Sequence, residues 1–329
     1  MDKKTIGSLL VTVSGLAFAA SAVAADAAAQ NYPTRPITMI VPFPAGGGSD
    51  NVARLVAKHL ADELGQTIVV ENRGGAGGNI GTRLIAQAKP DGYTIGLATP
   101  GPVSVGKSLY KNLPYDPATD FEPVILLNES PLVMAMNPDL GVKNYEMLAP
   151  WLKSLDREAN AAIGGTGSVN HLMTELYRQE SGERVLNVPY KGGSEAVTDT
   201  MAGHTDLLFI PMSAVLGPIK ANQLVPIFLT AENRSDLLPD VPAASEVGLP
   251  NVVGSAWNGI VAPKGTPAAV IDKLNTALNA VLKNPETLEA FNTQGMVAKG
   301  GTAADFQAFV DADAKKWREV IENSDIEKI

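Results

Sequence analysis

The sequence predicts an α/β fold made of two similar halves. Short runs rich in β-branched residues alternate with helical patterns, and a glycine-rich turn joins a strand to a helix in each half. Such alternation is typical of parallel sheets with helices on both faces. The length of 329 residues fits about two domains of roughly 150 residues each.

The first half opens with a buried strand at 37–41. A helix follows that carries Val52, Val56 and Leu60 on one face and ends near Gly65. Further strands are predicted at 67–71 and 93–98, separated by a helix at 79–88. The segments 121–127 and 132–136 are also predicted to be extended.

The alternation restarts after Asn137-Pro138, which marks the second half. Helices are predicted at 145–154, 169–180 and 194–202, and strands at 160–163, 185–188 and 207–210. Beyond a proline-rich stretch, a strand at 258–262 precedes helices at 267–283, 285–294 and 303–322.

The composition excludes several classes of function. The 26 basic and 35 acidic side chains give a net charge of −9, and no Lys/Arg cluster is present. Nucleic acid is therefore not an expected partner. No cysteine occurs, so thiol catalysis, disulfides and cysteine-bound zinc are excluded. Imidazole chemistry would depend on His59, His171 or His204.

Residues 1–25 have the order of a secretory signal peptide. Lys3 and Lys4 precede an uncharged, mainly apolar stretch that ends in small residues. The apolar part is shorter than the ~20 residues that a membrane-spanning helix needs. The protein is therefore expected to be exported, with cleavage near Ala24 or Ala25.

Each glycine-rich turn has the features of an anion site. In the first, Gly46, Gly47 and Gly48 lead into a helix that Ser49 or Asp50 is expected to cap. The second turn, 164–168, adds hydroxyl groups. Free amides and the partial positive charge of a helix N-terminus bind anions without a charged side chain. Because α/β sheets bind ligands beyond the carboxyl ends of their strands, the two turns are expected to share one cleft. The alternative is that the glycines only permit tight turns.

Residues 101–108 match the phosphate-loop pattern G-x-x-x-x-G-K-[ST] letter for letter. However, Pro102 removes an amide from a loop whose chemistry depends on amides. Pro114 also leaves room only for a short helix after Ser108. Export would separate the chain from cytoplasmic ATP. We interpret the match as coincidence.

The sequence favours a protein that is not an enzyme. It contains neither a G-x-S-x-G nucleophile elbow nor an H-E-x-x-H zinc motif. His171 and Glu175 provide only two of the three ligands of a catalytic zinc. The alternative is an exported hydrolase that uses Ser168 and His171, which would need a direct Ser–His contact and an oriented acid.

Short segments in a fixed order run through nearly the whole chain after residue 31. They include Val188-Pro189-Tyr190-Lys191-Gly192, and the others lie at 32–37, 41–50, 71–81, 90–94, 113–124, 167–172, 238–242, 257–259 and 262–267. Together these segments resemble the Bug family, the periplasmic solute-binding receptors of tripartite tricarboxylate transporters.

The resemblance implies a two-lobed, type II-like periplasmic binding protein. Lobe 1 would comprise 32–132 and 255–329, and lobe 2 would comprise 133–254. Such a protein is a monomer that closes around a small organic acid and delivers it to the membrane permease subunits of its transporter. No cofactor or metal is implied, because loop amides, hydroxyls and water from both lobes hold the carboxylate.

The resemblance also implies the residues that contact the ligand. Carried over by position, these are Phe43, Ala45, Gly48, Ser49 and Asp50 in lobe 1 and Thr166, Ser168 and Tyr190 in lobe 2, with Thr99 and Ser213 as additions. The chain departs from the family at Ile210, where an Asp is frequent, and at Gly101-Pro102-Val103, where the family is usually polar. These departures fall at the positions where the family would recognise a ligand amine and the distal half of the ligand.

Overall fold

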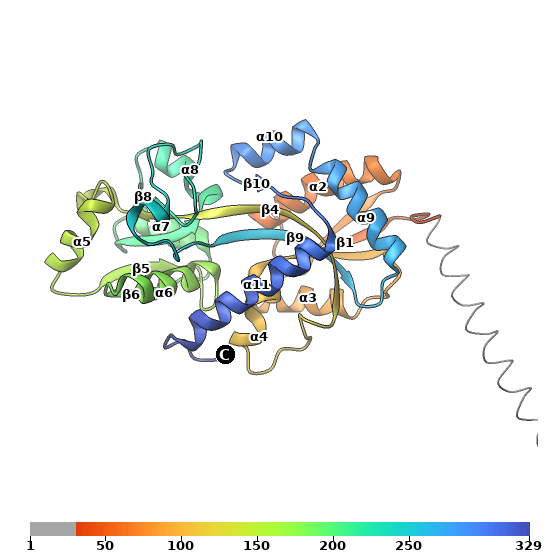
Figure 1. The fold of residues 1–329 in the computed structure, drawn as a ribbon, viewed down its shortest axis with the longest axis horizontal. Helices are drawn as coiled ribbons and strands as arrows, with labels where there is room; N and C mark the ends of the chain where they lie inside the picture. Colours follow the sequence, from red (N-terminus) through yellow and green to blue (C-terminus); the bar gives the residue numbers. More distant parts are fainter. Residues whose placement is uncertain (1–30) are drawn as a thin grey trace, which may run out of the picture.

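Residues 31–329 are described by a computed structural model, and they form two α/β lobes joined by long strands (Figure 1). The signal-peptide prediction falls on residues outside this range. Within it, ten strands form one continuous sheet of order β2-β1-β3-β9-β4-β7-β5-β6, in which β8 and β10 pair with β4 off this path.

Lobe 1 contains three parallel strands in the order β2-β1-β3: β1 (Ile37–Val41), β2 (Ile68–Asn72) and β3 (Thr94–Ala98). Helix α2 (Gly48–Leu64) follows β1 and ends at Gly65, whose φ of 64° is the left-handed conformation that glycine adopts at little cost. Helix α3 (Asn79–Ala86) follows β2. Strand β3 is followed by a π-helix (Gly101–Val105) that continues into helix α4 (Gly106–Leu109).

Two antiparallel strands connect the lobes. The first part of β4 (Phe121–Met136) pairs with β9 (Ser255–Pro263) in lobe 1, and its last five residues pair with β7 in lobe 2. The two extended segments predicted within 121–136 are therefore one strand. The prediction of purely parallel sheets is wrong here, because β4 carries the chain into lobe 2 and β9 brings it back (Figure 1).

Lobe 2 contains parallel strands β5 (Ala159–Ile163), β6 (Val185–Pro189) and β7 (Leu207–Pro211) in the order β7-β5-β6. Its helices, in chain order, are α5 (Tyr145–Ser154), α6 (Val169–Ser181), α7 (Gly193–Met201) and α8 (Met212–Lys220). Helix α8 and the following strand β8 (Val225–Leu229) were not predicted. Gly217 and Pro218 interrupt the helical pattern of α8, which explains the omission.

The C-terminal elements return to lobe 1 and then extend toward lobe 2. They are α9 (Ala268–Val281), α10 (Pro285–Thr293), β10 (Val297–Ala298) and α11 (Ala303–Glu322). Helix α11 buries Phe306 with lobe-1 side chains and Trp317 with lobe-2 side chains. It therefore crosses from one lobe to the other (Figure 1).

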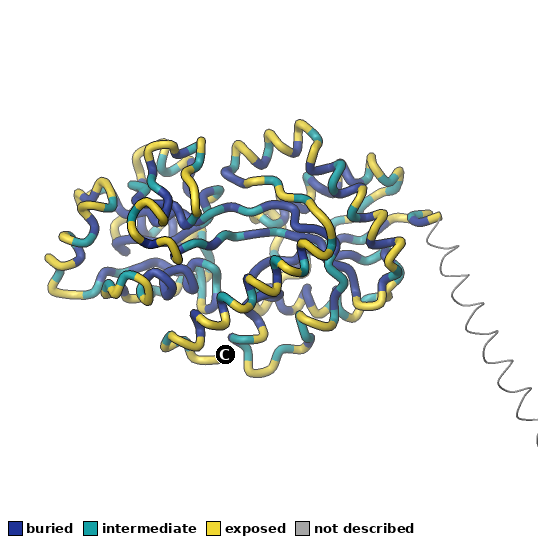
Figure 2. Tube along the Cα trace, in the orientation of Figure 1, coloured by how far each residue is buried: buried dark blue, intermediate teal, exposed yellow. Residues whose placement is uncertain are grey.

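The inner strands of each lobe are buried on both faces, as the dark strands in Figure 2 show, whereas the edge strands β2 and β6 are partly exposed. In lobe 1, α2 and α9 cover one face, while α11 and the π-helix cover the other. In lobe 2, α6 and α5 lie opposite α7 and α8. The predicted α/β class is confirmed. Across residues 31–329, none of the helices has both the length and the apolar character required of a membrane span.

Candidate ligand-binding site

The strand register makes the carboxyl ends of the parallel strands of the two lobes face each other along β4. Ala98, at the end of β3, aligns through Gly259 with Leu126 in β4. Pro211, at the end of β7, aligns with Leu132 in β4, and strand β7 runs in the opposite direction to β3. The two ends are thus six residues apart along β4, roughly 20 Å at ~3.3 Å per residue. The glycine-rich turns follow the neighbouring parallel strands β1 and β5, whose carboxyl ends point toward this interval from opposite sides.

The first turn, between β1 and α2, is held by Asp50. The Asp50 carboxylate accepts the Gly46 N–H at 2.8 Å, Arg54 Nε at 2.9 Å and Asn72 Nδ2 at 2.9 Å. The bond from Arg54 is the largest cause that lowers the pKa of Asp50 to about 2. The Asp50 side chain, only 3% exposed, is therefore a structural anchor of the turn.

The start of helix α2 leaves backbone N–H groups free. Its N-cap is Gly47, and no side chain caps it, so the predicted cap by Ser49 or Asp50 is wrong. The N–H groups of Gly48 and Ser49 have no acceptor among residues 31–329. Gly48 is exposed and Ser49 is half-buried, so both amides lie at the surface of the turn.

The second turn, between β5 and α6, uses glycine where the backbone requires it. Gly165 and Gly167 have φ angles of 111° and 75°, in the region that favours glycine. Ser168 caps α6 by accepting the backbone N–H of His171 at 3.3 Å, which leaves its own hydroxyl hydrogen available. Thr166, at the tip of the turn, is exposed.

The Tyr190 turn, between β6 and α7, packs directly against the second turn. A side chain at Gly164 would place its Cβ 3.0 Å from the backbone nitrogen of Gly193, and one at Gly165 would lie 3.6 Å from the Tyr190 carbonyl oxygen. The Tyr190 ring is half-buried against the lobe-2 core. Partial burial, followed by the nearby Asp199, raises the pKa of Tyr190, so the phenol stays neutral and can donate a hydrogen bond.

Thr99 and Ser213 follow the two facing strand ends, those of β3 and β7. Thr99 comes directly after β3, and its hydroxyl is buried without a hydrogen-bond partner among residues 31–329. Ser213 lies half-buried in the first turn of α8, directly after β7. The N-terminus of α8 was missed at the sequence level; Pro211, which is its N-cap, was the available signal.

Two contacts show how the turns assemble. Within lobe 1, a Cβ at Gly78 would lie 3.2 Å from the ring of Phe43 and 2.8 Å from Pro102, so the ends of β1, β2 and β3 are in contact. Between the lobes, a Cβ at Gly167 would overlap the side chain of Leu109 in α4. The segment after β3 therefore touches the Gly164–Ser168 turn directly. The exposed Ala45 lies in the first turn of this assembly.

The phosphate-loop match is not a phosphate loop in space. Residues 101–105 form the π-helix and 106–109 form α4, with Pro102 and Gly106 buried. Lys107 pairs with Asp116 at 2.7 Å. A helical, buried segment does not present the cradle of backbone amides that phosphate binding requires, which agrees with our interpretation of the match as coincidence.

The hydrolase alternative gains no support from His171. Its Nδ1 accepts the Gly167 N–H at 3.1 Å, and its Nε2 lies 3.9 Å from Glu175. Burial lowers the pKa of His171, which favours the neutral ring. The imidazole therefore braces the turn, and Ser168 makes its contact with the His171 backbone rather than with the ring.

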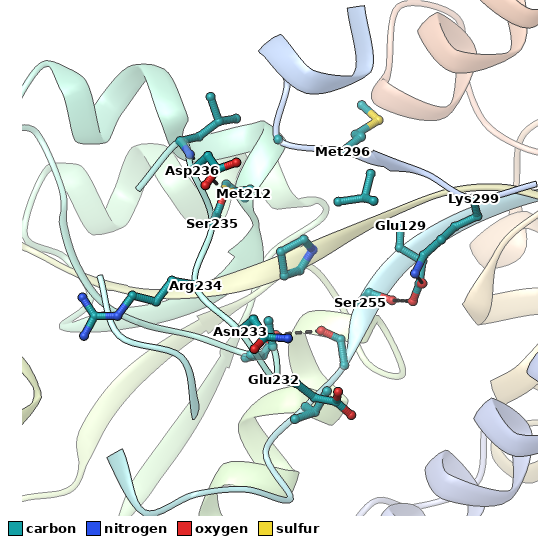
Figure 3. Close-up of a pocket in the computed structure, with 18 of the residues that line it drawn as sticks. Glu129, Met212, Glu232, Asn233, Arg234, Ser235, Asp236, Ser255, Met296 and Lys299 are labelled. Carbon is teal, nitrogen blue, oxygen red and sulfur yellow. Dashed lines mark hydrogen bonds and ion pairs between the residues drawn. The ribbon is translucent and has the colours of Figure 1, made fainter. Parts of the chain in front are cut away.

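A separate pocket of about 830 Å³ lies where the chain crosses between the lobes (Figure 3). Its walls come from the segment 230–237 after β8, from β4, β9, α8 and α11, and from the residues around β10 with the end of α10. Glu129 accepts a hydrogen bond from Ser255 and pairs with Lys299, both at 2.6 Å. None of the ten predicted contact residues lines this pocket. It lies at the strands that connect the lobes rather than at the turns.

Comparison with known proteins identifies the family. Residues 52–326 match the family described as "Tripartite tricarboxylate transporter family receptor". "Protein BugT" of Bordetella pertussis is 38% identical over 313 residues, which cover 95% of this chain and 96% of BugT.

Solved structures agree with this assignment. The periplasmic binding protein BugD is 36% identical with a TM-score of 0.79, covering 91% of this chain and 100% of that one. A protein of R. palustris solved with adipate is 32% identical with a TM-score of 0.81, covering 89% and 98%. MatC from Rhodopseudomonas palustris, with bound malate, is 30% identical with a TM-score of 0.78, covering 88% and 100%.

The fold is therefore that of a periplasmic binding protein, whose two lobes are joined by β4 and β9. Within this class, the chain belongs to the receptor family of tripartite tricarboxylate transporters. The resemblance to the Bug family is confirmed.

Proposed function

We propose that the protein captures a small organic carboxylate between its lobes and delivers it to the membrane permease subunits of a tripartite tricarboxylate transporter. The observation that carries this proposal is the pair of free helix N-termini. Gly48 and Ser49 at α2, and Val169 and Asn170 at α6, have backbone N–H groups without acceptors among residues 31–329. Such groups bind carboxylates well because they combine donors with the helix dipole.

We propose that the ligand contacts are the ten residues carried over from the family. In lobe 1 they are Phe43, Ala45, Gly48, Ser49, Asp50 and Thr99, and in lobe 2 they are Thr166, Ser168, Tyr190 and Ser213. Asp50 contributes through its backbone, because its carboxylate already accepts three bonds. The hydroxyls of Ser168 and Tyr190 add donors from the second lobe.

The class of ligand is supported by the relatives. One protein of this family fold was solved with adipate and another with malate, and both ligands are dicarboxylates. A chain with a net charge of −9 can hold such a ligand because local amide dipoles, rather than its overall charge, supply the attraction. We therefore expect an aliphatic mono- or dicarboxylate.

Closure of the lobes completes the proposed mechanism. Lobe 1, residues 32–132 and 255–329, and lobe 2, residues 133–254, would rotate about the connections near 121–136 and 231–257. Closure removes water, which strengthens the amide–carboxylate bonds, and the closed form is what the permease recognises. We propose that the mature protein works as a periplasmic monomer.

Isothermal titration calorimetry tests this function. Wild-type protein lacking residues 1–25 is titrated with succinate, malate, adipate, citrate, butyrate and hexanoate. Saturable binding of at least one carboxylate with a stoichiometry of one is expected. Absence of binding by all six, together with turnover of an ester substrate, would reject the receptor function.

A further inference from the structure

We propose that Lys191 selects ligands that carry a second negative charge. This proposal rests on the proposed function and adds the residue that separates dicarboxylates from monocarboxylates. It starts from the cations in the turns that follow the parallel strands. These turns, 42–47, 73–78, 99–100, 164–168 and 190–192, contain two basic residues, Arg73 and Lys191.

The two basic residues differ in their partners. The Arg73 guanidinium pairs with Glu71 at 2.9 Å, so its charge is already balanced. Lys191 is exposed, and its ammonium has no ion pair within residues 31–329. Arg54, one helical turn into α2, is likewise paired with Asp50 at 2.9 Å. Lys191 is therefore the basic residue of these turns whose charge is available to a ligand.

The backbone at Lys191 is held in place. Its N–H donates to Glu195 Oε2 at 3.2 Å, which fixes the turn to the start of α7. Its neighbour Tyr190 is bound to β5 through a 2.8 Å bond to the Ile163 carbonyl, directly before the Gly164–Ser168 turn. The long, flexible side chain of the exposed Lys191 thus starts from a rigid point next to the Gly164–Ser168 turn.

The charge balance favours a role in selectivity rather than in overall affinity. The first carboxylate is bound by neutral N–H and hydroxyl groups, which do not distinguish a monoanion from a dianion. A second carboxylate enters a chain with a net charge of −9, near the Glu195 carboxylate. A nearby ammonium offsets this repulsion by about 1 kcal/mol in water, or about fivefold in affinity, and by more where solvent is excluded.

The experiment compares adipate with hexanoate, which has the same chain length and one carboxylate. Dissociation constants are measured by calorimetry at 20 and 150 mM NaCl for wild type, Lys191→Gln and Lys191→Arg. Lys153→Gln is the matched control, because Lys153 is an exposed lysine on α5, away from the turns, and its loss changes the net charge equally. Melting temperatures establish that all four proteins are folded.

Lys191→Gln is expected to weaken adipate binding about fivefold at 20 mM NaCl and hexanoate binding less than twofold. The difference should shrink at 150 mM NaCl, where screening is stronger. Lys191→Arg should retain the preference, and Lys153→Gln should behave as wild type. Equal effects on both ligands, or no effect, would overturn the role of Lys191 while leaving the receptor function intact. If wild type binds neither these acids nor the others above, the proposed function itself fails, and this role fails with it.

Discussion

Asp50 and Ser168 each follow a glycine-rich turn in sequence, but their side chains act differently. Ser168 caps α6 and keeps a donor for a ligand. Asp50 turns its carboxylate inward to Gly46 and Arg54, so the negative charge at the start of α2 is compensated before an anion arrives. An uncompensated carboxylate here would repel the anionic ligand that we propose the free amides bind.

The Asp50 network predicts a pH-dependent contribution to stability. Because the pKa of Asp50 is lowered to about 2 in the folded state, its contribution is fully present above the unfolded pKa of about 3.9 and is lost as the pH falls toward 2. Asp50→Asn should cost about 2 kcal/mol at pH 7 and roughly half of that at pH 3. Urea unfolding at both pH values measures the difference, and an equal cost at both would contradict the assignment.

The amide of Gly48 allows a cleaner test of the site than a side chain does. Gly48 is the first residue of α2, where proline is well tolerated and only removes an N–H that has no acceptor in the described structure. Gly48→Pro should weaken carboxylate binding by roughly tenfold or more, the typical worth of a bond to a charged acceptor. Calorimetry measures this loss, and the melting temperature should change little.

The control for Gly48→Pro is Ala303→Pro. Ala303 is the first residue of α11, after the N-cap Thr302, and lies outside the strand-end turns. The same change of backbone chemistry should leave binding unaffected there. Comparable losses in both variants would mean that proline disturbs the fold and that the Gly48 amide has no special role.

At the scale of elements, the sequence predicts most of the strands and helices of each lobe because their apolar patterns are local. The helix bounds 145–154 and 303–322 coincide with α5 and α11. The union of two segments into β4 was not predictable, because 128–131, Asn-Glu-Ser-Pro, reads as a turn. The antiparallel direction of β9 was also missed. That direction depends on the return of the chain from lobe 2 to lobe 1, which no local pattern specifies.

The candidate site was predictable to a similar degree. Glycine spacing located both turns and Ser168, because these are local signals. The engagement of Asp50 was not predictable, since it depends on Asn72 from a neighbouring strand. The bracing role of His171 depends on how the 164–168 turn folds back on α6, which no local pattern specifies.

Helix α11 is the element that most directly couples the lobes. Phe306 and Trp317 are both 0% exposed, one in each core. Between them, Asp313 accepts the Trp257 Nε1–H at 2.9 Å, and Lys316 donates to the Val253 carbonyl at 3.2 Å. These bonds attach the middle of the helix to the start of β9 and the segment before it, where the chain leaves lobe 2.

This anchoring predicts cooperative unfolding. Phe306→Ala and Trp317→Ala should each cost about 3–5 kcal/mol, because each leaves a large cavity in a core. Both should shift one common urea transition, since α11 belongs to both lobes. Lys315→Ala, at an exposed position of the same helix, should stay within about 0.5 kcal/mol of wild type. Two separate transitions, each moved by only one variant, would show that the lobes unfold independently.

At the scale of the whole molecule, the proposed ligand turns and the proposed hinge lie in different parts of the same interval along β4. The turns lie at the strand ends, whereas the 830 Å³ hinge pocket is walled by both lobes and by α11. Rotation of one lobe against the other must change the shape of that pocket as it closes the turns on a ligand. Binding at the turns should therefore change the overall dimensions of the protein.

Small-angle scattering measures this change directly. With a carboxylate that binds in calorimetry present at 100 times its dissociation constant, the radius of gyration of the wild type should decrease, and the melting temperature should rise by the equivalent of about 2.7 kcal/mol. Gly48→Pro at the same ligand concentration should show smaller changes in radius of gyration and melting temperature. Both changes should reach the wild-type values when more ligand is added, because the lobes and hinge of this variant are unchanged. A wild type that binds and is stabilised but keeps its radius of gyration would mean that the lobes are already closed without ligand. In that case the permease could not use closure as its signal.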